Sequence, residues 1–316
     1  MVLDAAQVRA ALPMRLAIDA MRQAFALLAQ GRVDLPVRTQ VSLPGGAGSF
    51  LVMPVRADTA YGLGAKLVTV LPGNSAAGRP VVQAVVVLLD QVTGELVALL
   101  EGTSLTAIRT GAASGLATDL LARKDARRLT IIGSGVQART QLEGVCAVRD
   151  IERVTIWSRT REHARQFAAD VRAVGVVPEV EVAGTVAAAV EDADVMCLAT
   201  SALRPVLAAW DVPEGVHVNA IGSFRPDMQE FEPALLQRAR VVVDQKEAAL
   251  AEAGEVIEAV RGGLVNQADL LELGQVLAGQ VTGRESAAQI TVFKSVGLAV
   301  QDLAAAGQVA RFQAPA

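Results

Sequence analysis

The stretch LTIIGSGVQARTQL, residues 129–142, joins an apolar run to a glycine turn and then to a helix-like pattern. The turn has the spacing Gly133-x-Gly135-x-x-Ala138. The first glycine permits a tight turn, the second lets a ligand approach the backbone, and the small third residue lets helix and strand pack closely. A helix N-terminus at this point presents free N–H groups to phosphates. The stretch therefore predicts a dinucleotide-binding turn, and a glycine turn in another kind of α/β unit is the alternative. Three further residues are assigned to the same phosphate-binding segment: Ser134, Val136 and Gln137.

Patterns on either side of the turn indicate two kinds of structure. Residues 3–30 show apolar positions at helical spacing, and residues 33–101 consist of short apolar segments separated by Gly, Pro and Asn, which indicates an antiparallel meander. From 129 to about 245 strand and helix patterns alternate, as in a parallel sheet covered on both faces. The segment QITVFKSVGLAVQDLAAAG, residues 289–307, is interpreted as a helix that returns to the first domain.

The predicted fold class is therefore α/β with two domains. A chain of 316 residues is longer than one ordinary domain. We expect a Rossmann-type, doubly wound parallel sheet over residues 121–292. We expect a discontinuous α+β domain with an antiparallel sheet over residues 1–120 and 293–316.

Composition excludes several other classes of protein. The net charge is -4 and no basic block of five or more residues occurs, so no nucleic-acid partner is expected. The longest apolar run, VVQAVVVLL at 81–89, is far shorter than the roughly 20 residues that a membrane span requires. Cys146 and Cys197 form neither a metal motif nor a disulfide framework, and no metal is expected. We expect a soluble, cytoplasmic protein in which His163 and His217 are structural.

The residues after the second predicted strand bear on the choice of dinucleotide. An acidic side chain there would bind the ribose 2′-hydroxyl of NAD(H) and repel the 2′-phosphate of NADP(H). The sequence has Ser158, Arg159 and Thr160 instead. Two hydroxyls and a guanidinium favour a phosphate dianion, so NADP(H) is the expected cofactor and NAD(H) remains possible. The alternative is that Arg159 is a solvated residue in a turn.

Three cations outside this domain occupy unusual places. Arg38 begins a predicted strand, Lys66 lies inside the apolar strand LGAKLVTV, and Arg109 lies on a helix rich in small residues. A lone lysine in a strand usually faces solvent. Three such cations in one module, however, indicate a site for an anionic carboxylate. We call Arg38, Lys66 and Arg109 the cation cluster.

The chain resembles the ornithine cyclodeaminase/mu-crystallin family along nearly its whole length. The matching segments are PVRTQ (36–40), LVMP (51–54), AKLVTVLPGN (65–74), EGTSLTAIRTGAASGLAT (101–118), IIGSGVQA (131–138), IWSRTREHA (156–164), VNAIGSFRPDMQE (218–230) and TVFKSVG (291–297). The resemblance implies a homodimer formed through the first domain, with the substrate between that domain and the nucleotide domain.

The same resemblance implies roles for single residues. The cation cluster corresponds to the residues that hold the substrate carboxylate, and Lys66 is also the candidate to assist proton delivery. Met53 corresponds to a position close to the substrate, and Thr110 to one that positions the cofactor. Three residues correspond to the border of the nicotinamide: Ala199, Thr200 and Ser201.

One departure from the family pattern distinguishes its branches. Cyclodeaminases and the related alanine dehydrogenases resemble this chain at VNAIG, but they carry an aspartate two residues after it, which attends the substrate amine. This chain has Phe224 at that position. Phe224 is interpreted as a contact of the substrate ring, with a core residue as the alternative. The resemblance then implies an NAD(P)H-dependent reductase of a small cyclic imino acid, Δ1-pyrroline-2-carboxylate and also Δ1-piperideine-2-carboxylate. The alternatives are an alanine dehydrogenase-like reductase of open-chain imino acids, an ornithine cyclodeaminase, and a binder of small ligands without enzymatic activity.

Overall fold

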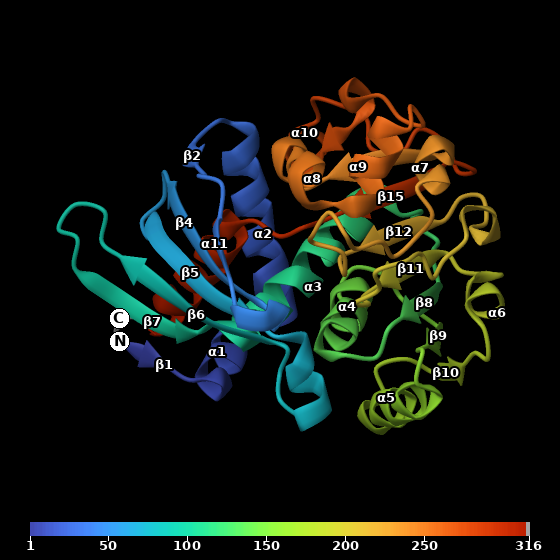
Figure 1. Cartoon of the computed structure of the whole chain (residues 1–316), viewed down its shortest axis with the longest axis horizontal. Helices are drawn as coiled ribbons and strands as arrows, with labels where there is room; N and C mark the ends of the chain where they lie inside the picture. Colours follow the sequence, from blue (N-terminus) through green and yellow to red (C-terminus); the bar gives the residue numbers. More distant parts are fainter. Residues whose placement is uncertain (314–316) are drawn as a thin grey trace. The chain divides into compact units, whose positions relative to one another are not determined.

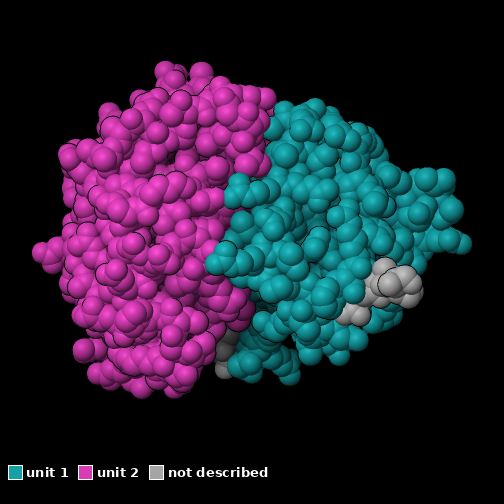
Figure 2. Space-filling model, turned by 180° about the vertical axis from the view of Figure 1, so that it is seen from behind, with its two compact units in different colours: residues 1–109, 298–316 teal, residues 110–297 magenta. Residues whose placement is uncertain are grey.

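The computed structural model describes residues 1–313, which form two compact units (Figures 1 and 2). Unit 1 contains residues 1–109 and 298–316, and unit 2 contains residues 110–297. These units divide at 109/110 and 297/298, whereas the sequence predicts domain boundaries at 120/121 and 292/293. The first unit ends inside helix α3 (Gly102–Leu121) rather than at its end, and residue 293 lies in a strand of unit 2, β15 (Ile290–Lys294).

Unit 1 is built on a seven-stranded sheet in which β4 to β7 form the antiparallel meander expected from the sequence. The sheet order is β1-β7-β6-β5-β4-β2, with β3 also paired to β4 and β1 parallel to β7. The strands are β1 (Val2–Leu3), β2 (Val33–Asp34), β3 (Thr39–Ser42), β4 (Ser49–Ala57), β5 (Leu63–Val70), β6 (Val82–Leu89) and β7 (Leu96–Glu101). Short 3-10 turns, η1 (Pro44–Gly46) and η2 (Pro72–Ala77), lie between strands.

Helices of unit 1 cover one face of this sheet. Helix α11 (Ala299–Gln313) packs on α2 (Met14–Ala29) and across β4, β5 and β6, while α1 (Ala5–Ala11) contacts β7. The expected single helix over residues 3–30 is wrong, because the chain begins with β1 and its helical part is interrupted at Pro13. A proline cannot donate the backbone hydrogen bond that a continuous helix needs, and Pro13 caps α2.

The segment 289–307 was also expected to be one helix, and this is wrong for its first part. Ile290–Lys294 forms β15, and all five residues are buried, whereas the helix begins only at Ala299. The run Ile-Thr-Val-Phe is β-branched and aromatic, which suits a strand that is buried on both faces.

Unit 2 contains an eight-stranded parallel sheet of order β10-β9-β8-β11-β12-β15-β13-β14, which confirms the expected fold class. Its other strands are β8 (Arg128–Ile132), β9 (Arg153–Trp157), β10 (Glu179–Val182), β11 (Val195–Leu198), β12 (His217–Ala220), β13 (Ala239–Val243) and β14 (Leu271–Glu272). The helices after α3 are α4 (Val136–Cys146), α5 (Arg161–Val174), α6 (Val186–Val190), α7 (Ala234–Arg238), α8 (Lys246–Glu252), α9 (Gly254–Arg261) and α10 (Leu273–Leu277), with turns η3 (Ala209–Asp211) and η4 (Gln267–Asp269). Within residues 1–313, every helix is too short or too polar to cross a lipid bilayer.

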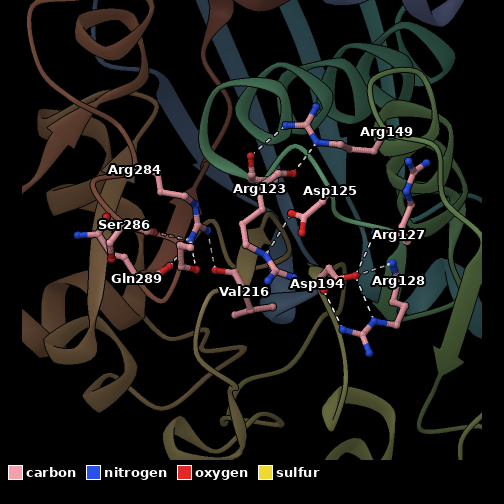
Figure 3. Close-up of polar contacts among 12 residues, drawn as sticks. Arg123, Asp125, Arg127, Arg128, Arg149, Asp194, Val216, Arg284, Ser286 and Gln289 are labelled. Carbon is pink, nitrogen blue, oxygen red and sulfur yellow. Dashed lines mark hydrogen bonds and ion pairs between the residues drawn. The ribbon is translucent and has the colours of Figure 1, made fainter.

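Hydrogen bonds of several arginines and of one buried carboxylate connect the segments at the amino ends of strands in unit 2 (Figure 3). Asp194, just before β11, accepts hydrogen bonds from the backbone N–H groups of Arg127 and Arg128, each at 3.0 Å, and from the Arg128 guanidinium. Burial raises the pKa of Asp194, but these hydrogen bonds outweigh burial and hold the pKa below its usual value. Arg284 donates to the carbonyls of Leu121 and Val216. These groups lie at the amino ends of the strands, opposite to the ends at which ligands bind in open α/β sheets.

Candidate functional site

The glycine turn of unit 2 has the geometry that a dinucleotide requires. Gly133 follows β8 with φ 126°, and a Cβ there would lie 2.3 Å from the Ala199 carbonyl oxygen. Gly135 is the N-cap of α4, no side chain caps this helix end, and the space where a Cβ of Gly135 would lie is open. Ala138 is fully buried where α4 packs on the sheet. The turn thus fits a pyrophosphate, which would approach Gly135 and the first N–H groups of α4.

The turn lies where the strand order of the sheet reverses. β9 flanks β8 on one side and β11 flanks it on the other. The backbone N–H of Ala199, directly after β11, donates to the Ile132 carbonyl at 2.9 Å. In open α/β sheets, ligands bind in the crevice at the carboxyl ends of strands at such a point. Ala199 and Thr200 are half-buried and Ser201 is exposed at this edge.

The residues expected near the adenosine ribose follow β9, beside the turn. The hydroxyl oxygens of Ser134 and Ser158 are 2.9 Å apart, so a hydrogen bond joins the turn after β8 to the end of β9. Arg159 and Thr160 are exposed, and Thr160 is the N-cap of α5. A guanidinium and hydroxyls are therefore available at this edge, while binding of a 2′-phosphate stays a prediction.

Two members of the cation cluster meet a carboxylate in the interior of unit 1. Lys66 on β5 and Arg109 on α3 are 3% and 5% exposed. The Lys66 Nζ lies 2.6 Å from Oδ2 of Asp302, and the Arg109 Nε lies 3.0 Å from Oδ1 of the same residue. Asp302 belongs to α11 and is itself buried. The sequence did not indicate that two of the three cations share a carboxylate from the protein itself.

The neighbouring Gln301 extends this arrangement. Its Oε1 accepts from the Arg109 Nη1 at 2.6 Å and from the backbone N–H of Leu298 at 3.2 Å. Both donors fix the orientation of the amide, so the NH2 group points away from them. The buried Nε2 has no hydrogen-bond partner in the described chain. Because buried donors are nearly always paired, this amide is available to an acceptor such as a ligand carboxylate.

Burial and neighbouring charges shift the pKa of Lys66 from its ordinary value. Burial lowers its pKa from 10.5 to about 8, because the charged form loses water. The Asp302 carboxylate opposes this fall in the pKa, whereas the positive charges of Arg109 and Arg38 add to it. Lys66 is thus mostly a cation at neutral pH and can release its proton just above it.

The other predicted substrate residues are placed as follows. Met53 on β4 is buried and stands opposite Lys66 in the β4–β5 register. Arg38 is half-buried and directly precedes β3, and it lies near enough to Lys66 to affect its titration. Thr110 is buried on α3, next in sequence to Arg109. Phe224 is half-buried after β12 and packs against the apolar core of unit 2, so both interpretations of this residue stay open.

The histidines and cysteines are placed away from any catalytic arrangement. His217 is fully buried on β12, with hydrogen bonds to Thr291 and Asn219, and burial lowers its pKa to about 3, so the ring is neutral. His163 is exposed on α5. Both cysteines are free, and burial raises the pKa of each thiol to about 12.

The two units together define a class of protein: a Rossmann-type dinucleotide-binding unit combined with an α+β unit that carries a buried cation–carboxylate group. The chain belongs to the ornithine cyclodeaminase/mu-crystallin family, whose model matches residues 1–312. This confirms the resemblance described above.

Individual relatives are similar over most of the chain. A Δ1-pyrroline-2-carboxylate reductase of Bacillus cereus is 45% identical over 274 residues, which cover 86% of this chain and 84% of the relative. The structure of Thermococcus litoralis Δ1-pyrroline-2-carboxylate reductase in complex with NADH and L-proline is 36% identical, has a TM-score of 0.95, and covers 99% of this chain and 97% of its own. An archaeal alanine dehydrogenase dimer with bound NAD is 35% identical, with a TM-score of 0.92 and coverages of 99% and 95%.

Proposed function

We propose that the chain is a nicotinamide-dependent reductase that converts Δ1-pyrroline-2-carboxylate to L-proline. Δ1-Piperideine-2-carboxylate, with a six-membered ring, would be a second substrate and give L-pipecolate. The observation that carries the proposal is the buried group of Lys66, Arg109 and Asp302, in a chain that also has a complete dinucleotide turn. Support also comes from the reductase of Bacillus cereus and from the Thermococcus litoralis structure, which holds NADH and L-proline.

The residues of the chain supply binding and orientation for this reaction. When bound, the reduced nicotinamide supplies the hydride that adds to the imine carbon, and a proton completes the amine. The substrate carboxylate is held by the cation cluster, with the free amide N–H of Gln301 as a further donor. Lys66 is protonated at neutral pH, and its main role is to bind the substrate carboxylate, with assistance to proton delivery as a minor one. Orientation of a cyclic iminium ion beside a hydride donor is a large part of such catalysis.

A panel of substrates tests the proposal directly. The purified protein is incubated with NADPH or NADH and with Δ1-pyrroline-2-carboxylate, Δ1-piperideine-2-carboxylate, pyruvate plus ammonia, or L-ornithine. We expect oxidation of the cofactor with both cyclic imines and L-proline as the product of the first. Faster turnover of pyruvate with ammonia, or conversion of ornithine to proline, would replace this function with one of the alternatives.

A reductase of open-chain imino acids is the second candidate, and the archaeal alanine dehydrogenase supports it. Against it stands Phe224, at the position where the related enzymes carry an aspartate that attends the substrate amine. An apolar ring gives an added ammonium group no partner, and a desolvated charge without a partner is costly. A compact cyclic imine needs no such partner.

We infer that NADPH is used in preference to NADH, because the turn after β9 carries Arg159 and no carboxylate. Replacing Arg159 with Ala is expected to raise the KM for NADPH by roughly 13-fold to 160-fold, since a hydrogen bond to a charged group contributes about 1.5–3 kcal/mol and each 1.36 kcal/mol is a factor of ten. The KM for NADH is expected to change less than twofold. Initial-rate kinetics with both cofactors measure this difference.

Arg165→Ala is the matched control, because Arg165 lies on α5, the helix that follows Arg159, and its side chain is 56% exposed. It is expected to leave both KM values unchanged. An equal loss with both cofactors in the Arg159 variant would remove Arg159 from the 2′-phosphate site.

We also propose that the protein is a homodimer formed through the sheet of unit 1. Along β5 the buried residues alternate with half-exposed ones, Leu63, Ala65, Leu67 and Thr69, on the face opposite to Lys66. A largely apolar, half-exposed sheet face is typical of an interface between subunits. The archaeal alanine dehydrogenase is described as a dimer. Light scattering of the purified protein gives the molecular mass that decides this point, and a monomer would contradict the proposal.

A further inference from the structure

A buried carboxylate in unit 2 joins the ends of two parallel strands. Glu230 is fully buried in the segment that follows β12. Its Oε1 accepts hydrogen bonds from the backbone N–H of Thr200 at 2.7 Å and from the Thr200 hydroxyl at 2.9 Å. Its Oε2 accepts from the backbone N–H of Gly222 at 2.6 Å. Three donors from two separate turns thus converge on one carboxylate.

The two turns belong to neighbouring strands of the sheet. Thr200 follows β11 and Gly222 follows β12, and these strands pair in parallel. A Cβ on Gly222 would lie 2.1 Å from the Thr200 carbonyl oxygen and 2.3 Å from the Glu230 Oε1. The turns therefore approach as closely as the backbone allows. We call residues 199–201 and 222–224 the paired turns.

A second layer of buried groups fixes Glu230 itself. Its backbone N–H donates to the Glu255 Oε1 at 2.7 Å, and the Ser223 hydroxyl donates to the same carboxylate. Lys294 on β15 donates from Nζ to the Ser223 carbonyl at 2.6 Å, and its charge also opposes the rise that burial causes in the pKa of Glu230. A fully bonded network of this kind is rigid, since the low local dielectric makes each bond costly to break.

We propose that Glu230 is a positioning residue for the nicotinamide half of the cofactor. The inference rests on the proposed nicotinamide-dependent function. By its bonds to Thr200 and Gly222, the carboxylate sets the spacing of the paired turns, which lie beside the point where the strand order reverses. Its bonds go to neither residues 133–138 nor 158–160, which serve the pyrophosphate and the adenosine. The direct hydrogen bonds of its carboxylate therefore act on the paired turns and not on the pyrophosphate turn.

The arrangement needs a carboxylate rather than an amide. The two oxygens of Glu230 accept from three donors, and the two backbone N–H groups belong to different turns. A glutamine offers one oxygen and one NH2 group, so one turn would face a donor with its own N–H. That turn would lose its bond and move away from the other one. Glu230→Gln has nearly the same volume as the native residue and isolates this loss.

Binding of NADH and of ADP-ribose, which lacks the nicotinamide ring, separates the two halves of the site. For Glu230→Gln we expect the Kd of NADH to rise about 10-fold, the effect of losing one hydrogen bond to a charged group. The Kd of ADP-ribose is expected to stay within twofold of the native value. Calorimetry gives both constants, and the enhanced fluorescence of bound NADH reports separately on the surroundings of the ring.

The matched control is Glu214→Gln, which makes the same chemical change at an exposed position of unit 2. It is expected to alter neither constant. Thr200→Val removes only the hydroxyl donor, and it serves as the second variant if Glu230→Gln does not fold. This variant is expected to raise the Kd of NADH several-fold and to leave the Kd of ADP-ribose unchanged.

The outcomes are distinguishable. If both variants bind NADH and ADP-ribose more weakly by the same factor, or bind both as tightly as the native protein, the positioning role is overturned. The proposed function is then unaffected. A native protein that binds ADP-ribose and NADH with equal affinity would also overturn it, because the ring would then contribute nothing. A native protein that binds neither compound nor their 2′-phosphorylated forms would overturn the proposed function itself.

Discussion

Replacing Lys66 with Met is expected to lower kcat/KM for Δ1-pyrroline-2-carboxylate by roughly 30-fold to 5,000-fold. Removing one partner of a buried charge pair costs about 2 to 5 kcal/mol, and each 1.36 kcal/mol is a factor of ten. Lys66 is 3% exposed and faces Asp302, so a substrate carboxylate that loses Lys66 finds no water to replace it. Steady-state kinetics with saturating cofactor measure the loss.

A substrate that lacks the carboxylate tests the reason for this effect. The cyclic imine 1-pyrroline is expected to be reduced slowly by the native enzyme and only a few-fold more slowly by the variant. Lys124→Met is the control, because the Lys124 side chain is 78% exposed. If the variant loses the same factor with both imines, Lys66 acts on the imine nitrogen or on folding and not on the carboxylate.

Replacing Asp302 with Asn is expected to shift the alkaline limb of the kcat/KM profile to lower pH. The cationic form of Lys66 binds the substrate, so native activity falls as the pH rises through the Lys66 pKa of about 8. Asp302 raises this pKa, whereas burial, Arg109 and Arg38 lower it. Without the carboxylate only the factors that lower the pKa remain, so Lys66 loses its proton at a lower pH. Because kcat/KM reports the free enzyme, rates measured from pH 6 to 10 show the shift.

The same variant is expected to be less stable by about 3 to 5 kcal/mol, since both Lys66 and Arg109 lose their buried counter-ion. Denaturant unfolding at pH 7 measures this value. Asp19→Asn is the matched control in unit 1, because Asp19 is exposed on α2. An alkaline limb that stays in place would show that Lys66 is not the group whose charge controls activity.

The dinucleotide turn could be predicted from sequence because its information is local. Gly133, Gly135 and Ala138 lie within six consecutive residues, between a strand and a helix that each have a clear period. Lys66 became a candidate through its combination with Arg38 and Arg109 and through the family resemblance, because a lone lysine in a strand usually faces solvent. Strand β15 was assigned to a helix, because a short apolar run next to a helical pattern suits either structure.

Asp302 and Glu230 could not be found in this way. Asp302 has the spacing of an ordinary polar residue on an amphipathic helix, and its partner Arg109 is 193 positions away in the chain. Glu230 ends the family-matching segment 218–230, but it lies in an irregular stretch without a period, and the sequence does not indicate that it meets Thr200. The function of each depends on which elements the fold brings together, and that information is contained in tertiary packing rather than in local sequence.

The position of α11 in the chain has a consequence for biosynthesis. Lys66 and Arg109 leave the ribosome well before Asp302, which follows Arg109 by 193 residues. At roughly 5 to 20 residues per second, translation separates the two events by about 10 to 40 s. During this interval unit 2 is itself being synthesised, while unit 1 lacks both the Asp302 carboxylate and the helix that packs across β4, β5 and β6. The nascent first unit is therefore the part of the chain that most needs protection by a chaperone.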